Sequence, residues 1–248
     1  MYALLRMLLV LIQFLYNLYE TIRCACFALH RWCISAASTT SELDTLVHFA
    51  TLARNKTPKH LVIVFGLCDE SVLDCVRIIG WCITLDIPYI SFFDRNGFLK
   101  KNETNLRREF EKKRPDLVEH IVWNSHTKAS GQNGITDRSK INVSLLSDID
   151  GRGKIIALTQ SLAKAVSSGN LDPEEITDQL ITEKLQIKGM PDPDLALIYG
   201  HICSTFGLLP WHTRTTEFLM LPLYVNVSVK DFACLLERYG KCVQRYGK

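Results

Sequence analysis

Six short apolar runs, separated along the chain by helical patterns, constrain the fold more than any other feature of this sequence. The runs occupy residues 61–66, 87–93, 120–123, 141–146, 194–199 and 216–221. The first is apolar throughout, which is typical of a strand buried on both faces in a parallel sheet. Helical patterns follow the runs at residues 71–86, 99–113, 153–167, 173–186 and 229–245. This alternation predicts an α/β domain over residues 60–248, with a six-strand, mainly parallel sheet flanked by helices.

The N-terminal segment, residues 1–37, differs from the rest of the chain. Residues 7–19 are apolar except for Gln13 and Asn17, and Arg6 and Glu20 bracket them. The run is shorter than the ~20 residues of a spanning helix, although a snorkelling Arg6 would lengthen it. A cleaved signal peptide would need a small-residue processing site, which is lacking, and a soluble amphipathic helix would not be apolar nearly all round. We therefore expect a membrane anchor; whether it spans the bilayer or lies in the lipid interface stays open.

Residues 38–59 are expected to link this anchor to the domain. Ser41 with Asp44 resembles a capping box that opens a helix reaching about Arg54. The sequence Lys56-Thr57-Pro58-Lys59 then ends that helix.

Composition excludes several functional classes. The net charge of +3 is too small for a nucleic-acid binder, which would show a concentrated basic face with interleaved aromatics. Nine cysteines without paired CxxC spacing argue against a disulfide framework and a zinc site, and indicate a reducing, cytosolic environment. Cys68, Cys75 and Cys82 recur every seven residues, which favours core packing. The seven histidines show no metal-ligand spacing.

Generic enzyme motifs are missing from the sequence. It contains no G-x-G-x-x-G after the first strand, no P-loop and no G-x-S-x-G. Ligands of open α/β sheets bind beyond the carboxyl ends of strands, and the first strand is followed there by Asp69 and Glu70. Acids that open a helix usually complement its dipole, so we interpret both as caps.

The C-terminus carries a row of cations. Arg238, Lys241, Arg245 and Lys248 fall at i, i+3, i+7 and i+10, on one face of the expected last helix. Physical chemistry alone favours cations that complement the helix dipole. The alternative is an anion-binding tail, in which the planar fork of Arg245 pairs with phosphate and Gly247 lets its backbone N–H approach the same group.

From about Lys59 to Lys248 the chain resembles the cis-prenyltransferase family, most closely its Nogo-B receptor branch. The resemblance is carried by residues 191–197, 204–218 and 229–242, by a scatter of positions between Trp81 and Asn102, and by the terminal Arg-x-Gly. It implies a six-strand, mainly parallel sheet surrounded by helices, in agreement with the pattern of apolar runs.

The chain departs from catalytic members of that family at the positions that bind diphosphate. Their Asp-Gly-Asn after the first strand reads Gly66-Leu67-Cys68 here. Ile198 and Ser204 stand where two arginines are expected, and Phe206 stands where a serine is expected. A diphosphate needs several fixed cationic or N–H donors, so the resemblance implies no catalytic or metal-binding residues in this chain and a catalytic partner subunit.

Arg245 and Gly247 match the family's Arg-x-Gly motif, which crosses the dimer interface. The resemblance implies that they bind isopentenyl diphosphate in the partner's site, while the partner holds Mg²⁺ and the allylic substrate. The implied complex is dehydrodolichyl diphosphate synthase, which makes the dolichol precursor at the endoplasmic reticulum membrane, with this domain facing the cytosol.

Two other functions stay open at this point. One is a membrane receptor or scaffold without a catalytic role, which would place the domain in an extracellular or lumenal compartment. The other is an independent homodimeric prenyltransferase that uses Asp69 and Glu70.

Overall fold

The computed structural model describes residues 2–37, 44, 46, 56–66, 71–124, 140–187, 190–200, 202–221 and 227–243 of the chain. It divides into two compact units, Met1–Asp44 and Thr45–Lys248. The helix expected between Ser41 and Arg54 lies almost wholly outside the described residues. The division into an anchor over residues 1–37, a linker over 38–59 and a domain over 60–248 stays a prediction.

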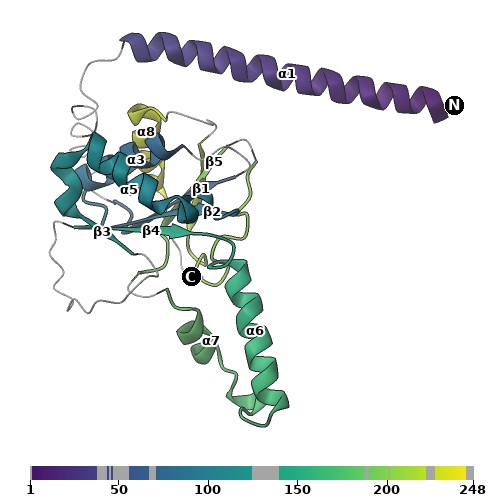
Figure 1. The fold of residues 1–248 in the computed structure, drawn as a ribbon, viewed down its shortest axis with the longest axis vertical. Coiled ribbons are helices and arrows are strands. Elements are labelled where there is room, and N and C mark those ends of the chain that lie inside the picture. The colour runs from purple at the N-terminus through teal and green to yellow at the C-terminus, as the bar shows by residue number, and fades with distance from the viewer. Residues whose placement is uncertain are drawn as a thin grey trace. The chain divides into compact units, whose positions relative to one another are not determined.

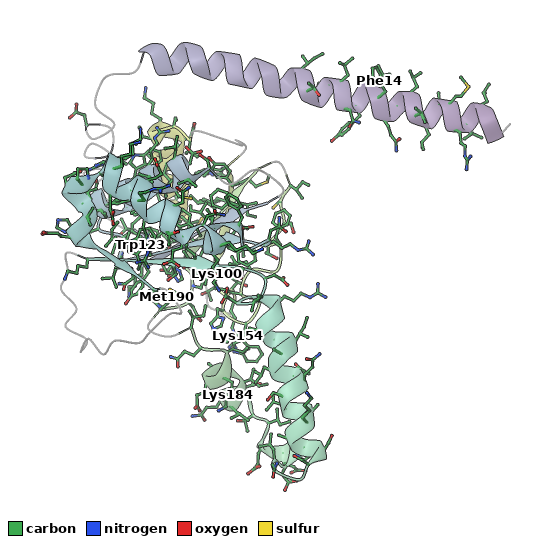
Figure 2. The ribbon with its side chains drawn as sticks, in the orientation of Figure 1. Phe14, Lys100, Trp123, Lys154, Lys184 and Met190 are labelled. Carbon is green, nitrogen blue, oxygen red and sulfur yellow. The ribbon has the colours of Figure 1, made fainter. Side chains whose placement is uncertain are left out.

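The first unit is built on one long helix, α1 (Tyr2–Ala37), of 36 residues. Every side chain from Leu4 to Tyr19 is exposed, and Phe14, labelled in Figure 2, is 61% exposed. Leucine, isoleucine and methionine have high or moderate helix propensity, which explains why an apolar run forms a helix. In the described part of the chain, no helix combines the length and apolar character needed to cross a membrane.

The second unit contains a six-stranded sheet in the described residues, and all its strand pairs are parallel. The strands run in the order β3-β4-β2-β1-β5-β6 (Figure 1). Their bounds are β1 His60–Phe65, β2 Tyr89–Asp94, β3 Ile121–Trp123, β4 Ile141–Leu146, β5 Leu195–Tyr199 and β6 Glu217–Leu221. The predicted sheet is confirmed, and each apolar run lies within two residues of its strand.

Helices occur in the crossover connections between these parallel strands, and they pack against one face of the sheet. The α-helices are α3 Val72–Thr84, α4 Phe98–Lys101, α5 Glu103–Lys113, α6 Arg152–Ser167, α7 Asp178–Leu185 and α8 Val229–Lys241, and the 3₁₀ turns are η1 Pro115–His120 and η2 Pro173–Glu175. In Figure 1, α3, α5 and α8 lie on one side of the sheet, whereas α6 and α7 extend away from the other side.

Two of the predicted helices are interrupted. The pattern over residues 99–113 forms α4 and α5, because the Asn102 side-chain amide donates to the Phe98 carbonyl at 2.9 Å and ends the first helix. The pattern over residues 173–186 forms η2 and α7, because Thr177 starts a new helix by accepting from the Leu180 N–H at 3.2 Å. Both interruptions lie at residues whose side chains hydrogen-bond the local backbone, Asn102 and Thr177.

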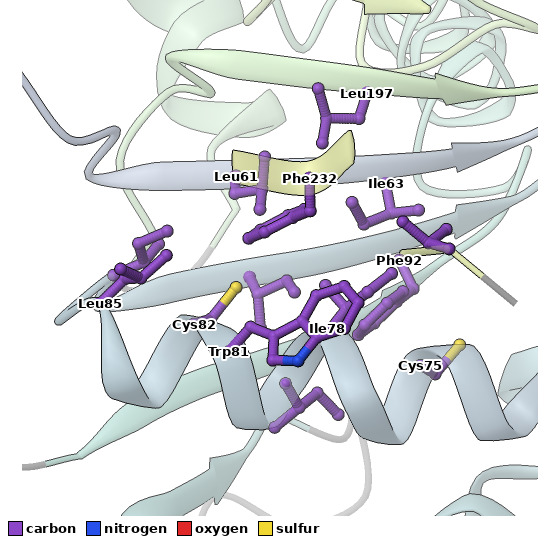
Figure 3. Close-up of a cluster of buried hydrophobic side chains, with 14 of the residues drawn as sticks. Leu61, Ile63, Cys75, Ile78, Trp81, Cys82, Leu85, Phe92, Leu197 and Phe232 are labelled. Atoms are coloured by element: carbon purple, nitrogen blue, oxygen red, sulfur yellow. The ribbon is translucent and has the colours of Figure 1, made fainter. Parts of the chain in front are cut away.

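The larger core lies between the sheet and helices α3, α5 and α8. Figure 3 shows Ile78 and Trp81 of α3 facing the strands, with Phe232 of α8 packed on the same apolar layer. Cys75 and Cys82 are buried in this cluster, which confirms core packing for them, whereas Cys68 lies outside the described residues. Burial raises the pKa of the Cys82 thiol, so it stays protonated and inert.

His60 is a buried histidine with hydrogen-bond partners on both ring nitrogens. Its Nδ1 lies 2.7 Å from the Pro191 carbonyl and its Nε2 lies 2.8 Å from the Ser91 hydroxyl. Because a carbonyl can only accept, Nδ1 carries the proton and Ser91 donates to Nε2. Burial lowers the pKa of His60, so the neutral ring is favoured. The ring therefore joins β1, β2 and the segment before β5, in a structural role.

Candidate functional site

The order of the strands marks one place for a ligand. β1 lies between β2 and β5. From β1 the chain first adds β2, β3 and β4 on one side of that strand, and it later adds β5 and β6 on its other side. Such a switch point opens a crevice beyond the carboxyl ends of the two strands. Gly66, the residue after β1, lies at this switch point, and its N–H donates to the Tyr199 carbonyl at 3.4 Å.

The ring of Phe206 lies against Gly66 at the switch point. A Cβ placed on Gly66 would lie 3.0 Å from two ring carbons of Phe206 and 3.3 Å from the Tyr199 carbonyl oxygen. Phe206 has φ +51°, and Gly207 follows with φ +87°. A non-glycine residue at positive φ is strained by about 1–3 kcal/mol, so packing of the ring must compensate. An apolar ring thus lies where catalytic relatives are expected to place a phosphate-binding serine.

The two positions expected to carry arginine in catalytic relatives also lack a cation here. Ile198 lies in β5, 1% exposed, and packs in the second core cluster beside Val64 and Leu208. The Ser204 hydroxyl accepts from the Phe206 N–H at 3.2 Å and so supports the turn that carries the ring. Both substitutions therefore serve packing or local structure.

Acids at the same edge of the sheet are engaged in local structure. Asp94 ends β2, is buried, and accepts from the N–H groups of Asn96 at 2.8 Å and Leu99 at 3.2 Å. Asp74, in the first turn of α3, accepts from the Tyr199 hydroxyl at 2.7 Å. These carboxylates accept hydrogen bonds within a turn and between β5 and α3.

Asp150 is paired with Lys100, which Figure 2 labels. The Lys100 ammonium donates to both Asp150 oxygens, at 2.8 and 2.6 Å, and the Ser147 N–H donates to Oδ2 at 2.8 Å. Burial alone would raise the pKa of Asp150, but the bonds from Lys100 and Ser147 outweigh burial and lower it. Over the residues that the structure describes, no group of three His, Cys, Asp or Glu side chains could hold a metal ion. Asp69 and Glu70 lie outside those residues.

Helix α8 leads to the C-terminal tail. Ser228 caps its first turn by accepting from the Asp231 N–H at 3.1 Å, and its buried face includes Phe232 and Tyr239. The helix ends at Lys241, and Cys242 is extended with φ −74° and ψ 129°. The predicted helix to Arg245 is therefore wrong. Arg245 and Gly247, the predicted diphosphate-binding residues, lie outside the described part of the chain.

The early end of α8 has a local and a tertiary cause. Gly240 and β-branched Val243 are weak helix formers near the C-terminus. The Cys242 N–H donates to the Tyr239 carbonyl at 3.0 Å in a tight last turn, and Lys56 donates to the Cys242 carbonyl at 2.9 Å. The helical face that carries Arg238 and Lys241 therefore ends with α8, and sequence analysis missed the role of Lys56.

Helix α6 presents a second feature that the sequence pattern did not single out. None of its residues is buried, although it contains several apolar side chains, and Ile156 is 49% exposed. Its first turn is fastened to the end of α7, because Lys154 donates to the carbonyls of Leu185 at 2.8 Å and Gln186 at 3.1 Å (Figure 2). A helix that is held at its first turn and that buries none of its apolar residues can present them to another protein.

Comparison with known proteins agrees with this fold. The NUS1 subunit of the dehydrodolichyl diphosphate synthase complex from Homo sapiens is 32% identical over 199 residues, which cover 78% of this chain and 68% of that protein. An isoprenyl transferase from Brucella abortus is 26% identical over 160 residues, which cover 64% of this chain and 61% of that protein.

Solved structures show the same architecture. Lavandulyl diphosphate synthase from Lavandula x intermedia, solved with dimethylallyl diphosphate, superimposes with a TM-score of 0.57 at 19% identity, and the match covers 77% of this chain and 99% of that one. No family model matches the sequence. Nevertheless, the identity and coverage of the human relative show that this chain belongs to the cis-prenyltransferase family, in the branch of the dehydrodolichyl diphosphate synthase complex subunits.

Proposed function

We propose that this chain is the non-catalytic subunit of a dehydrodolichyl diphosphate synthase complex. The complex condenses isopentenyl diphosphate onto farnesyl diphosphate and makes a long-chain cis-polyprenyl diphosphate for dolichol and protein glycosylation. The observation that carries the proposal is the ring of Phe206 against Gly66, together with buried Ile198, at the switch point of the sheet. A diphosphate needs cationic and N–H donors, and these apolar side chains supply none. The switch point is therefore not suited to bind a diphosphate.

The chain contributes to catalysis through its tail. Arg245 pairs bidentately with the diphosphate of isopentenyl diphosphate in the partner's site, and Gly247 lets a backbone N–H approach the same group. Mg²⁺ is bound mainly by the partner with the diphosphates, where it neutralises their charge. Asp94 and Asp150 are consistent with this division, because both accept hydrogen bonds from groups within the domain.

The partner is a catalytic cis-prenyltransferase subunit, and it binds over helix α6. Ile156 of α6 is exposed within this chain, and the other large apolar side chains of the helix are only partly buried. A relative with the same fold can cover them with an equivalent helix, as obligate subunits commonly do. The exposed helix therefore favours a heterodimer or a larger heteromer.

Reconstitution tests the proposed function. The full chain is purified alone and with a co-expressed catalytic subunit, and polyprenyl diphosphate synthesis is measured with farnesyl and isopentenyl diphosphates. We expect no product from the isolated chain and full activity from the complex, with the catalytic subunit alone as the control. Full activity of the isolated chain would refute the proposal. A catalytic subunit that is equally active without this chain would favour a scaffold.

Residues 2–37 anchor the chain at the endoplasmic reticulum membrane, with the domain facing the cytosol. The support is the band of exposed apolar side chains from Leu4 to Tyr19, since each buried leucine contributes about 1.5–3 kcal/mol to lipid binding.

We expect the full chain to sediment with phosphatidylcholine vesicles containing phosphatidylserine, and Leu8→Glu with Leu15→Glu to reduce the bound fraction at least tenfold. The exposed Lys59→Glu variant is the control for added charge. Equal sedimentation of all three proteins contradicts the anchor.

A further inference from the structure

Lys56 meets the end of helix α8, although 186 positions separate it from Cys242. We propose that Lys56 is a positioning residue, which fixes the point where the C-terminal tail leaves α8 and so aims Arg245 at the diphosphate. This inference rests on the proposed function of the tail. Lys56 is not expected to touch substrate itself.

Three contacts place the Lys56 side chain and backbone on the last turn of α8. Its Nζ donates to the Cys242 carbonyl at 2.9 Å and lies 4.5 Å from the centroid of the Tyr239 ring. A Cβ placed on Gly240 would lie 3.7 Å from the Lys56 carbonyl oxygen, so this backbone segment also passes close to the helix. A cation at this end of a helix complements the dipole and satisfies a carbonyl that has no helical partner.

The segment that carries Lys56 is itself held firmly. Pro58 is buried, and the N–H groups of Lys59 and His60 both donate to Asp194, at 2.7 and 3.0 Å. His60 then begins β1 in the centre of the sheet. Lys56 is therefore attached to the rigid domain, and through its ammonium group it attaches the Cys242 carbonyl to the same domain.

Position and reach connect this contact to the tail. The helix is over at Cys242 and Val243 is 79% exposed, so within the described residues the Cys242 carbonyl is the last hydrogen-bonded group of this segment. Arg245 follows three residues later, and three extended residues span at most about 10 Å. Fixing the start of so short a segment limits the volume that the guanidinium can search, which lowers the entropy lost when it binds phosphate.

The test compares Lys56→Met with wild type in the assembled complex. Methionine keeps an unbranched apolar stem over Tyr239 but removes the ammonium, so the fold is preserved. We expect kcat/KM for isopentenyl diphosphate to fall roughly tenfold, while KM for farnesyl diphosphate stays unchanged, because only the aim of the tail is lost. Lys56→Arg should restore most of the loss. Lys59→Met, at an exposed lysine three positions along the same segment, is the matched control and should behave as wild type.

A double-mutant cycle separates this inference from the proposed function. If Lys56 acts through the tail, Lys56→Met has no further effect in the Arg245→Ala background. Additive effects, or an unchanged kcat/KM in the single variant, overturn the positioning role while the tail's function stands. If Arg245→Ala itself leaves the kinetics unchanged, the tail's function fails instead. Equal melting temperatures and equal recovery of the complex are required, and if Lys56→Met lowers either, Lys56 is merely structural.

Discussion

Replacing Arg245 with alanine is expected to lower turnover of the assembled complex by well over tenfold while folding stays intact. Loss of one charged donor to a substrate or transition state costs about 2–4 kcal/mol, and each 1.4 kcal/mol corresponds to about a tenfold change in rate. Arg245→His should behave similarly, because imidazole lacks the planar fork that grips two phosphate oxygens. The measurement is steady-state synthesis of polyprenyl diphosphate by the co-purified complex.

Arg238→Ala provides the control for this experiment. Arg238 is exposed in the last turn of α8, three residues before the helix ends. It is therefore a cation near the tail that does not belong to the Arg-x-Gly motif. We expect its replacement to change turnover by less than about twofold, as is usual for an exposed cation. Equal losses from both variants would mean that general positive charge, and not the Arg-x-Gly tail, supports catalysis.

Replacing Phe232 with alanine is expected to destabilise the isolated chain by about 3–5 kcal/mol, because it empties a large site in the core. The Phe232 side chain is fully buried, and its ring lies 5.2 Å from the Trp81 ring at an angle of 41° (Figure 3). In a chain of this size, each kcal/mol lowers Tm by about 2–4 °C, so a fall of roughly 6–20 °C is expected. Thermal unfolding followed by circular dichroism measures it.

Lys230→Ala is the matched control for Phe232, because Lys230 lies two residues earlier on the exposed face of the same helix. It should leave Tm within about 2 °C of wild type. If Phe232→Ala behaved like this control, α8 would not be packed on the sheet as Figure 3 shows. The tail would then follow a helix that is not fixed to the domain.

Most of the fold could be predicted from the sequence because buried parallel strands carry their own signal. The runs that became β1 and β5 are apolar on both faces, and the helical patterns between them leave few topologies. Helix boundaries were less predictable. At Asn102 the side-chain amide donates to the Phe98 carbonyl, and hydrophobic periodicity does not predict such a single hydrogen bond.

The candidate site, like the fold, could be predicted only in part from the sequence. The resemblance to catalytic family members predicts that Ile198, Ser204 and Phe206 replace diphosphate-binding residues. How the space is used became visible only in the structure, where the Phe206 ring lies on Gly66 in a left-handed backbone conformation. A positive φ at a phenylalanine cannot be read from local propensity, because it is stabilised by tertiary packing.

By itself the sequence determined the sheet and the presence of a terminal Arg-x-Gly, and its resemblance to the cis-prenyltransferases predicted the loss of the diphosphate-binding residues. Only the tertiary structure decided that α8 ends at Lys241 and that Lys56 donates to the carbonyl of Cys242, the residue after the helix. The reason is the separation of the two residues along the chain. Helix propensity and hydrophobic periodicity act over a few neighbouring residues, whereas an ammonium group that arrives from the start of β1 depends on how the whole domain is packed.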